Sequence, residues 1–344
     1  MLLHILSSLS VVCCIFSELT IQIFHCKMPF RPTFLPYTRR IPPPSRAWPI
    51  QVNIRSTRSF SSCNALKEDL SDVKITDRFS MKDRTVLVTG GGRGIGFAIC
   101  KAIAQLGGNV AVLDALPEPV EEFHTLETRY GVKAFYERAD VTQQASLESA
   151  FGSVLKQAGS FQGCVTAAGI ALDKPFLEHQ WEECQRVLSV NVLGTFWTAK
   201  LMAAHMASRE QGGSIVMIAS IAAQGIKVPE QNLAVYNMSK AAVKGLVGPL
   251  AVELAEMKIR VNSISPGVIL SPMTNALKTE YPHLLEMFEN AAPLKRIGIP
   301  QDLTPMACYL LSDASSYTTG GDFVITGGMH AGVSPSYVKP VVTS

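Results

Sequence analysis

From residue 84 onward, short runs of β-branched and apolar residues alternate with longer stretches in which apolar residues recur every three or four positions. The short runs predict strands, and the three- to four-residue recurrence predicts amphipathic helices. Strands are predicted at 85–89, 109–114, 133–138, 164–167, 214–219, 260–264 and 322–326, and helices at 94–106, 119–130, 143–158, 179–207, 235–257 and 302–312. Such an alternation is typical of a parallel sheet with helices on both faces. We therefore predict one doubly wound, Rossmann-type α/β domain with a seven-stranded sheet over residues 81–332.

The first 60 residues have a different character. Residues 1–27 form an apolar start, and residues 28–60 contain six Arg and no acidic residue among Ser, Thr and Pro. An Arg-rich, acid-free segment is typical of a mitochondrial transit peptide. We expect a targeting leader at 1–60, a linker at 61–80, a tail at 333–344 and a location in the mitochondrial matrix. For residues 1–27, translation from Met28 is favoured over a genuine anchor, and for the location two alternatives stay open. These are a cytoplasmic protein, and a membrane-associated one if residues 1–27 are a genuine anchor.

The composition fits a globular protein, with 344 residues, 47% hydrophobic and 17% charged. Residues 1–60 contain seven Lys or Arg and one Glu, whereas the rest contains 24 Lys or Arg and 27 Asp or Glu. The excess positive charge therefore belongs to the leader, so we expect neither nucleic acid nor a stable membrane association for the body. The eight Cys form no C-x-x-C pair and have no His at zinc-ligand spacing. We expect no metal, and four of them (Cys100, Cys164, Cys184 and Cys308) as small buried apolar residues.

A glycine-rich turn joins the first predicted strand to the first predicted helix. The segment reads Thr-Gly-Gly-Gly-Arg-Gly-Ile-Gly over residues 89–96. At a helix N-terminus, unpaired amides and the helix dipole favour an anion such as a pyrophosphate. Gly90 permits the tight turn, Gly94 lets the backbone approach the phosphates, and Gly96 lets helix pack on strand; Arg93 and Ile95 complete the predicted cofactor turn. A G-x-G-x-x-G match is weak alone, but this one has the strand before it and the helix after it.

Asp114 ends the second predicted strand, 18 residues after Gly96. A carboxylate there accepts hydrogen bonds from ribose hydroxyls and repels a 2′-phosphate. No Lys or Arg follows Asp114 directly, so NAD is favoured over NADP. Arg93 opposes this preference because it lies in the phosphate turn. The alternative interpretation of Asp114 is a turn cap.

Tyr236 and Lys240 lie four residues apart at the start of a predicted helix, so both project from one helical face. A nearby ammonium is expected to lower the pKa of the phenol and to make Tyr236 a usable acid/base. Ser220 ends the preceding strand, at the sheet edge where ligands bind in such folds. These three residues are the predicted catalytic group. Each alone also has a structural explanation, such as helix capping.

With these motifs in order over residues 81–330, the chain resembles the short-chain dehydrogenase/reductase family. Further matching pieces are Asp140-Val141, Ala167-Ala168-Gly169, Asn191, Pro266-Gly267 and the terminal Gly327-Gly328. The resemblance implies Tyr236 as proton-transferring residue, Lys240 as its partner and ribose ligand, Ser220 as the residue that positions the substrate, and Asn191 in a water relay. It also implies cofactor contacts at Asp140, Val141, Ala168, Gly169, Pro266, Gly267, Val268 and Ser271. Two departures are Thr166-Ala167, where the family carries two Asn, and Ser271, where it commonly carries Thr.

The segment between Ser220 and Tyr236 is longer than in many relatives, and it includes the polar stretch 227–233. Together with the following motifs it is similar to the fungal polyol and ketose branch of the family. That branch implies an NAD-dependent oxidation of a sugar alcohol such as arabinitol, with residues 271–290 as a substrate lid and a homotetramer or homodimer as the assembly. Alternatives are an NADP-dependent reductase of a ketose such as sorbose or xylulose, and a 3-oxoacyl-thioester reductase. A nucleotide-binding protein without turnover is a further alternative.

Overall fold

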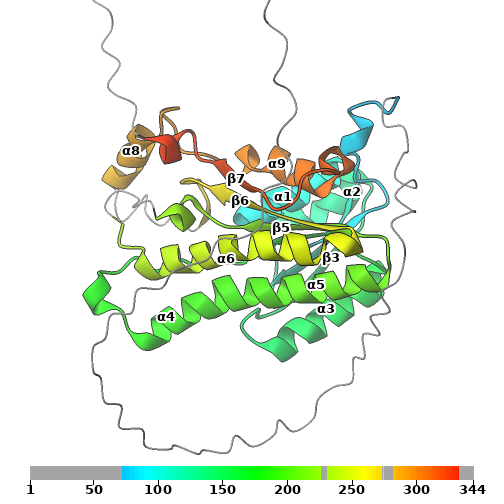
Figure 1. Cartoon of the computed structure of the whole chain (residues 1–344), viewed down its shortest axis with the longest axis horizontal. Helices are drawn as coiled ribbons and strands as arrows, with labels where there is room; N and C mark the ends of the chain where they lie inside the picture. Colours follow the sequence, from blue (N-terminus) through cyan, green and yellow to red (C-terminus); the bar gives the residue numbers. More distant parts are fainter. Residues whose placement is uncertain (1–71, 226–230, 273, 275–281, 333–344) are drawn as a thin grey trace, which may run out of the picture. The chain divides into compact units, whose positions relative to one another are not determined.

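The computed structural model describes residues 72–225, 231–272, 274 and 282–332 (Figure 1). The predicted leader, most of the predicted linker and the predicted tail lie outside the described residues.

Seven parallel strands form one sheet in the order β3-β2-β1-β4-β5-β6-β7 (Figure 1). Their bounds are β1 Thr85–Thr89, β2 Asn109–Asp114, β3 Ala134–Arg138, β4 Gly163–Thr166, β5 Gly213–Ile218, β6 Ile259–Pro266 and β7 Asp322–Ile325. The predicted seven-stranded, doubly wound fold is confirmed. The order reverses between β1 and β4, and in such sheets the crevice beyond the carboxyl ends of these strands takes the ligand.

Helices cover both faces of the sheet (Figure 1). The first face carries α1 Gly94–Gln105, α2 Leu126–Tyr130 and α9 Thr304–Leu311, and the second carries α3 Gln144–Ala158, α5 Gly194–Ser208 and α6 Ala234–Glu253. Strand β1 shows why two separate cores result. Val86 and Val88 pack in the core of the first face, whereas Leu87 packs in the core of the second. Because alternate side chains point to opposite faces, a central strand of a covered sheet must be apolar throughout.

The long helix predicted at 179–207 is present as a continuous helical stretch, Trp181–Ser208, with a π-helical turn inside it. Helix α4 spans Trp181–Leu188, a π-helical turn follows at Ser189–Leu193, and α5 begins at Gly194. A π-helical turn holds one extra residue and is not visible in apolar periodicity, so the sequence predicted the helix but not this turn. By length and composition, Trp181–Ser208 is one helical stretch in the described part that could cross a membrane. In the structure α5 instead packs against β4 and β5.

The described part of the predicted lid contains a helix that the sequence pattern did not predict, α8, Pro282–Ala291. Leu284 and Phe288 of α8 are buried with Ile297 in a small third core, against which Leu233 and Val268 pack. These contacts connect α8 to the segments that precede α6 and follow β6. The remainder of the predicted lid, residue 273 and residues 275–281, lies outside the described residues.

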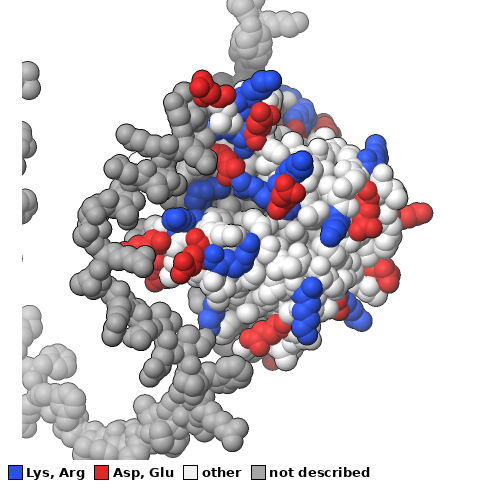
Figure 2. Space-filling view, turned by 90° about the vertical axis from the view of Figure 1, so that its right-hand side faces the viewer, with Lys and Arg blue, Asp and Glu red and all other residues white. Residues whose placement is uncertain are grey.

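The surface charges and the burial of the cysteines can be compared with the expectations from sequence. On the face shown in Figure 2, Lys and Arg side chains lie interspersed with Asp and Glu. Cys100, Cys164 and Cys308 are buried as predicted, whereas Cys184 is only half-buried. Burial raises the pKa of the Cys308 thiol to about 12, so this thiol stays protonated.

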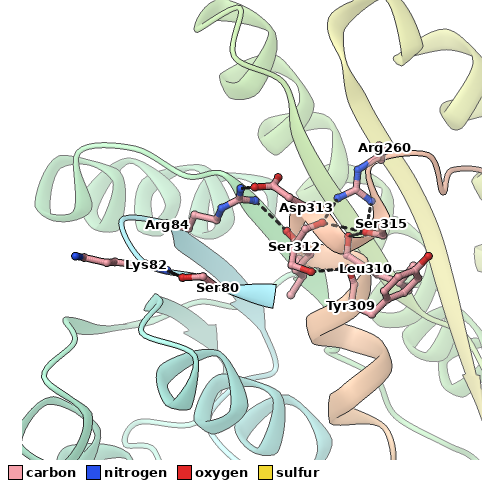
Figure 3. Close-up of polar contacts among 10 residues, drawn as sticks. Ser80, Lys82, Arg84, Arg260, Tyr309, Leu310, Ser312, Asp313 and Ser315 are labelled. Atoms are coloured by element: carbon pink, nitrogen blue, oxygen red, sulfur yellow. Dashed lines mark hydrogen bonds and ion pairs between the residues drawn. The ribbon is translucent and has the colours of Figure 1, made fainter. Parts of the chain in front are cut away.

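The amino edge of the sheet is fixed by two arginines (Figure 3). Arg260 of β6 donates to Ser315 Oγ at 2.8 Å and to the carbonyl oxygens of Ser312 at 3.1 Å and Thr318 at 3.4 Å. Arg84, directly before β1, pairs with the more exposed Asp313. Arg260 thereby satisfies carbonyl groups at the carboxyl end of α9.

Replacing Arg260 by Met is expected to lower the free energy of unfolding by about 2 to 3 kcal/mol, because it removes three hydrogen bonds that a part-buried guanidinium donates. Arg84→Met, which breaks a mainly exposed ion pair, serves as the matched control with a loss below about 1 kcal/mol. Urea unfolding at pH 7 measures both values. Equal losses for the two variants would contradict the assignment.

Candidate active site

One cavity of about 560 Å³ lies at the carboxyl edge of the sheet and receives residues from both halves of the fold. It is lined by fourteen of the residues predicted from sequence: Gly90, Arg93, Gly94, Ile95, Gly96, Ala168, Gly169, Ser220, Tyr236, Lys240, Pro266, Gly267, Val268 and Ser271. The structure therefore brings the glycine turn and the predicted catalytic group to one site. Asp114, Asp140, Val141 and Asn191 do not line this cavity.

The glycine turn has the geometry of an anion-binding helix start. Gly90 has a φ of +69° and donates its N–H to the Leu113 carbonyl oxygen at 2.8 Å. A Cβ at Gly90 would lie 2.6 Å from the Ala168 nitrogen, so no side chain fits there. Helix α1 begins at Gly94, and its first amides are the donors that a helix leaves unpaired. The residues present therefore fit the pyrophosphate of a dinucleotide.

Asp114 is hydrogen-bonded to this turn. Its Oδ2 accepts from the Gly92 N–H at 2.8 Å, and its Oδ1 accepts from the Leu116 N–H at 3.0 Å. In the structure Asp114 therefore caps the turn, as in the alternative interpretation based on sequence. Its contact with a ribose stays a prediction. A carboxylate oxygen has more than one acceptor position, so the two roles are compatible. Arg93 is exposed and lines the cavity.

Ser220, Tyr236 and Lys240 reach the cavity from two elements. Ser220 follows β5, and its Oγ accepts from the Ala222 N–H at 3.1 Å. Tyr236 and Lys240 lie in the first turns of α6, with the Lys240 Nζ 5.8 Å from the centre of the Tyr236 ring. Lys240 Nζ also donates to the Ile218 carbonyl oxygen at 2.8 Å, which connects α6 to the end of β5.

The pKa of Tyr236 differs from the expectation based on sequence. Burial raises the pKa of its phenol, and only the hydrogen bond with Ser220 opposes that rise. Burial also lowers the pKa of Lys240 to about 8. A poorly hydrated site disfavours the charged form of both groups. In the protein without cofactor, Lys240 therefore does not lower the pKa of the Tyr236 phenol toward neutral pH.

The lowered pKa of Lys240 predicts a pH-dependent stability. Between about pH 8 and its ordinary value of 10.5, the unfolded state binds more protons than the folded state, so stability rises with pH. Relative to Lys240→Met, the wild-type free energy of unfolding is expected to rise by about 2 kcal/mol from about pH 7 to pH 9.5. Urea unfolding of both proteins at the two pH values measures it. A constant difference would show that Lys240 is not held in a poorly hydrated environment.

Asn191 is fully buried beside this group and acts on it through hydrogen bonds. The π-helical turn places its side chain against Ile170, where Oδ1 accepts from the N–H at 2.9 Å and Nδ2 donates to the carbonyl oxygen at 2.9 Å. Nδ2 also donates to Ser239 Oγ at 2.9 Å, and that hydroxyl donates to the Tyr236 carbonyl oxygen at 2.7 Å. Asn191 thus connects the end of β4 to α6, while its predicted water relay stays a prediction.

Sequence reasoning missed several residues of this region. Ser239 is one, because a buried hydroxyl inside a helix carries no distinctive pattern. Thr274 and Asp173 also line the cavity. Asp173 follows Gly169 by four residues, and its place after a strand at the carboxyl edge was the signal that could have identified it. Thr166, which stands where the family carries Asn, has a buried hydroxyl without a hydrogen-bond partner among the described residues.

No cluster of three or more His, Cys, Asp or Glu that could hold a metal ion occurs among the described residues. The groups that the cavity does present are the Tyr236 phenol, the Ser220 hydroxyl, the Lys240 ammonium and the glycine turn.

Comparisons with known proteins agree with this geometry. A family model described as "Enoyl-(Acyl carrier protein) reductase" matches residues 90–330. Sorbose reductase sou1 of Schizosaccharomyces pombe is 36% identical over 74% of this chain and 98% of its own length. The ribulose-forming D-arabinitol 2-dehydrogenase of Scheffersomyces stipitis is 30% identical over 76% and 98%. The NADP-dependent mannitol dehydrogenase of Aureobasidium melanogenum is 34% identical over 74% and 95%.

Solved structures show the same likeness. A short-chain type dehydrogenase/reductase from Mycobacterium marinum matches with a TM-score of 0.68 at 36% identity, over 74% of this chain and 98% of the other.

Proposed function

Because this chain belongs to the short-chain dehydrogenase/reductase family, we propose that it is a NAD-dependent dehydrogenase of a neutral sugar alcohol, with arabinitol as the model substrate. The observation that carries the proposal is that Ser220, Tyr236 and Lys240 line the same cavity as the glycine turn. The similarity to arabinitol, sorbose and mannitol enzymes supports the substrate class.

The residues of the site supply proton transfer and orientation. A nicotinamide dinucleotide held at the glycine turn would supply the hydride acceptor for alcohol oxidation, or the hydride donor for the reverse reaction. The phenolate oxygen of Tyr236 takes the hydroxyl proton of the alcohol, which leaves Tyr236 as the neutral phenol. Ser220, already hydrogen-bonded to Tyr236, orients the same substrate oxygen. Lys240 stabilises the phenolate electrostatically, and Asn191 fixes the backbone at Tyr236 through Ser239.

The choice of NAD rests on Asp114, whose carboxylate at the end of β2 disfavours a 2′-phosphate. A second candidate function is NADP-dependent reduction of a ketose such as sorbose or xylulose. It is favoured by Arg93, a cation that lines the cavity, and by the NADP-dependent mannitol relative. A 3-oxoacyl-thioester reductase is less favoured, since polar residues occupy the cavity wall near Tyr236 and the body carries no excess of basic residues.

The test is the initial rate of absorbance change at 340 nm with NAD⁺ or NADP⁺ and arabinitol, mannitol, xylitol or sorbitol. Oxidation of a polyol with NAD⁺ supports the proposal. A preference for NADP⁺ moves the assignment to the ketose reductase. Reduction of an acetoacetyl thioester, with no turnover of any polyol, would overturn the substrate class, and no turnover of either class would favour a binding protein.

We also propose that residues 28–60 direct the protein to the mitochondrial matrix, on the strength of their Arg-rich, acid-free composition. Fluorescent fusions of residues 1–71 and 28–71 test it. Matrix fluorescence of the shorter fusion supports the proposal, whereas a cytoplasmic signal from both fusions would contradict it.

A homodimer or homotetramer is proposed as the assembly. The support is a set of exposed apolar side chains along α4 and the π-helical turn that follows it, with Trp181 79% and Leu193 52% exposed. Large apolar side chains of this kind are typical of interfaces. Light scattering after gel filtration tests it, with Trp181→Glu expected to lower the mass; a monomeric wild type would contradict the proposal.

A further inference from the structure

The cavity wall contains polar residues that neither the glycine turn nor the proton-transfer group explains. Of the other lining residues, Asp173, Gln231 and Thr274 are polar, whereas Ile221, Leu233 and Phe288 are among the apolar ones. Thr274 Oγ1 is occupied, since it donates to the Ile269 and Ser271 carbonyl oxygens and accepts from the Ser271 N–H. Asp173 and Gln231 are therefore the side chains whose polar groups remain to be assigned.

Asp173 is held at a fixed place relative to Tyr236. Its Oδ1 accepts from the Asn232 N–H at 2.7 Å, and the N–H of the next residue, Lys174, donates to the Asn232 carbonyl oxygen at 3.0 Å. These two bonds join the segment after β4 to the residues immediately before α6. Tyr236 lies four residues after Asn232. The two hydrogen bonds therefore hold the Asp173 carboxylate beside the residues that immediately precede α6.

The negative charge of Asp173 is not neutralised by the adjacent lysine. Lys174 Nζ binds the two carboxylate oxygens of Glu183 at 2.8 and 3.1 Å, and this pairing lowers the pKa of Glu183. Among the described residues, Asp173 forms no ion pair and its Oδ2 accepts no hydrogen bond. An exposed carboxylate with one fixed and one available oxygen therefore lines the cavity.

The part of the wall that contains Gln231 extends beyond the main cavity. Gln231 and Leu233 also line a second cavity of about 220 Å³, which adjoins the first through these two residues. An amide such as that of Gln231 both donates and accepts hydrogen bonds, as a hydroxyl ligand requires. A substrate longer than its reacting carbon therefore meets polar groups along this part of the wall.

We propose that Asp173 determines substrate specificity by binding a hydroxyl group remote from the reacting carbon, with Gln231 beside it, and by excluding anionic substrates. The proposal rests on the proposed function and narrows its substrate class to neutral polyols and ketoses, as opposed to sugar acids. A hydroxyl that donates to a carboxylate makes a charge-assisted hydrogen bond. A carboxylate or phosphate on the substrate is instead repelled by Asp173.

The experiment compares Asp173→Asn with the wild type on D-arabinitol, on cyclohexanol and on D-gluconate. Asn keeps an acceptor for the Asn232 N–H but removes the charge. The KM for arabinitol is expected to rise by about 10- to 100-fold, with kcat within about threefold of the wild type. The kcat/KM ratio of gluconate to arabinitol is expected to rise. Gln231→Leu provides a second variant, with a rise in KM for arabinitol expected for the same reason.

Glu182→Gln serves as the matched control, because Glu182 is an exposed carboxylate of α4 that lines neither cavity. Its KM for arabinitol should equal that of the wild type. An effect of Asp173→Asn on kcat alone would assign Asp173 to support of Tyr236 and overturn the proposal, as would unchanged constants. A wild type that turns over no polyol would overturn the proposed function and this proposal together, whereas an active wild type with an unaffected variant overturns this proposal alone.

Discussion

Replacing Tyr236 by Phe is expected to lower kcat/KM for polyol oxidation by between about 10²- and 10⁴-fold, because it removes the group that takes the substrate proton. The variant keeps the ring that lines the cavity, so cofactor affinity should change little. Initial rates at 340 nm measure the first value, and quenching of protein fluorescence by the cofactor measures the second. Because burial raises the pKa of this phenol, wild-type oxidation is expected to accelerate as the pH rises into the alkaline range.

Tyr309→Phe is the matched control for this experiment. The Tyr309 hydroxyl lies 2.9 Å from Thr318 Oγ1 near the amino edge of the sheet, far along the chain from the catalytic helix. It should retain wild-type turnover. A Tyr236→Phe enzyme that keeps more than about a tenth of the wild-type rate would contradict the assignment of proton transfer.

Replacing Gly96 by Ala is expected to weaken cofactor binding by at least about 100-fold, because the glycine turn must then move away from α1. A Cβ at Gly96 would overlap the Gly90 carbonyl oxygen and would lie 2.8 Å from the Gly90 carbonyl carbon and 3.0 Å from the Gly91 Cα. All three atoms belong to the backbone, so no rotation of a side chain relieves the clash. Titration with NAD⁺ or NADP⁺ measures the loss.

Gly152→Ala is the control for this substitution. Gly152 lies inside α3, and a Cβ there would have no atom within 4 Å. Ala favours a helix interior over Gly, so this variant should be more stable by about 0.5 to 1 kcal/mol and should bind the cofactor as the wild type does. Wild-type affinity in Gly96→Ala would show that the turn does not hold the pyrophosphate.

The sequence predicted most of the fold because the strands of a covered parallel sheet carry a strong signal. The observed bounds of β1 and β2 equal the predicted ones, since the interior side chains of these central strands are buried and apolar on both faces, whereas polar residues stand at their ends. The seven parallel strands in one sheet and the helices on both of its faces also agree with the prediction. Strand β6 extends two residues past its predicted end, to Pro266, beside the predicted cofactor contact Gly267.

Placement of the site residues was predictable for the same reason. Ser220 and the glycine turn directly follow strands, and the carboxyl ends of parallel strands meet at one edge. Tyr236 and Lys240 share a face because of helical periodicity alone. These are local rules, and a single sequence contains the information they need.

What only the tertiary structure decided depends on contacts between segments far apart in the chain. The π-helical turn between α4 and α5, which buries Asn191 against Ile170 and Ser239, follows from partners that apolar periodicity does not encode. The raised pKa of Tyr236 follows from burial, which the spacing to Lys240 does not reveal.

The hydrogen bond from the Asn232 N–H to Asp173 joins two loops that lie 59 residues apart in the chain. Neither loop has an apolar periodicity from which this contact could be predicted. Repeating patterns along the chain therefore determined the sheet, the turn and the catalytic helix of this protein. Hydration, charge and hydrogen bonding at the site were decided only when the folded chain brought these distant groups together.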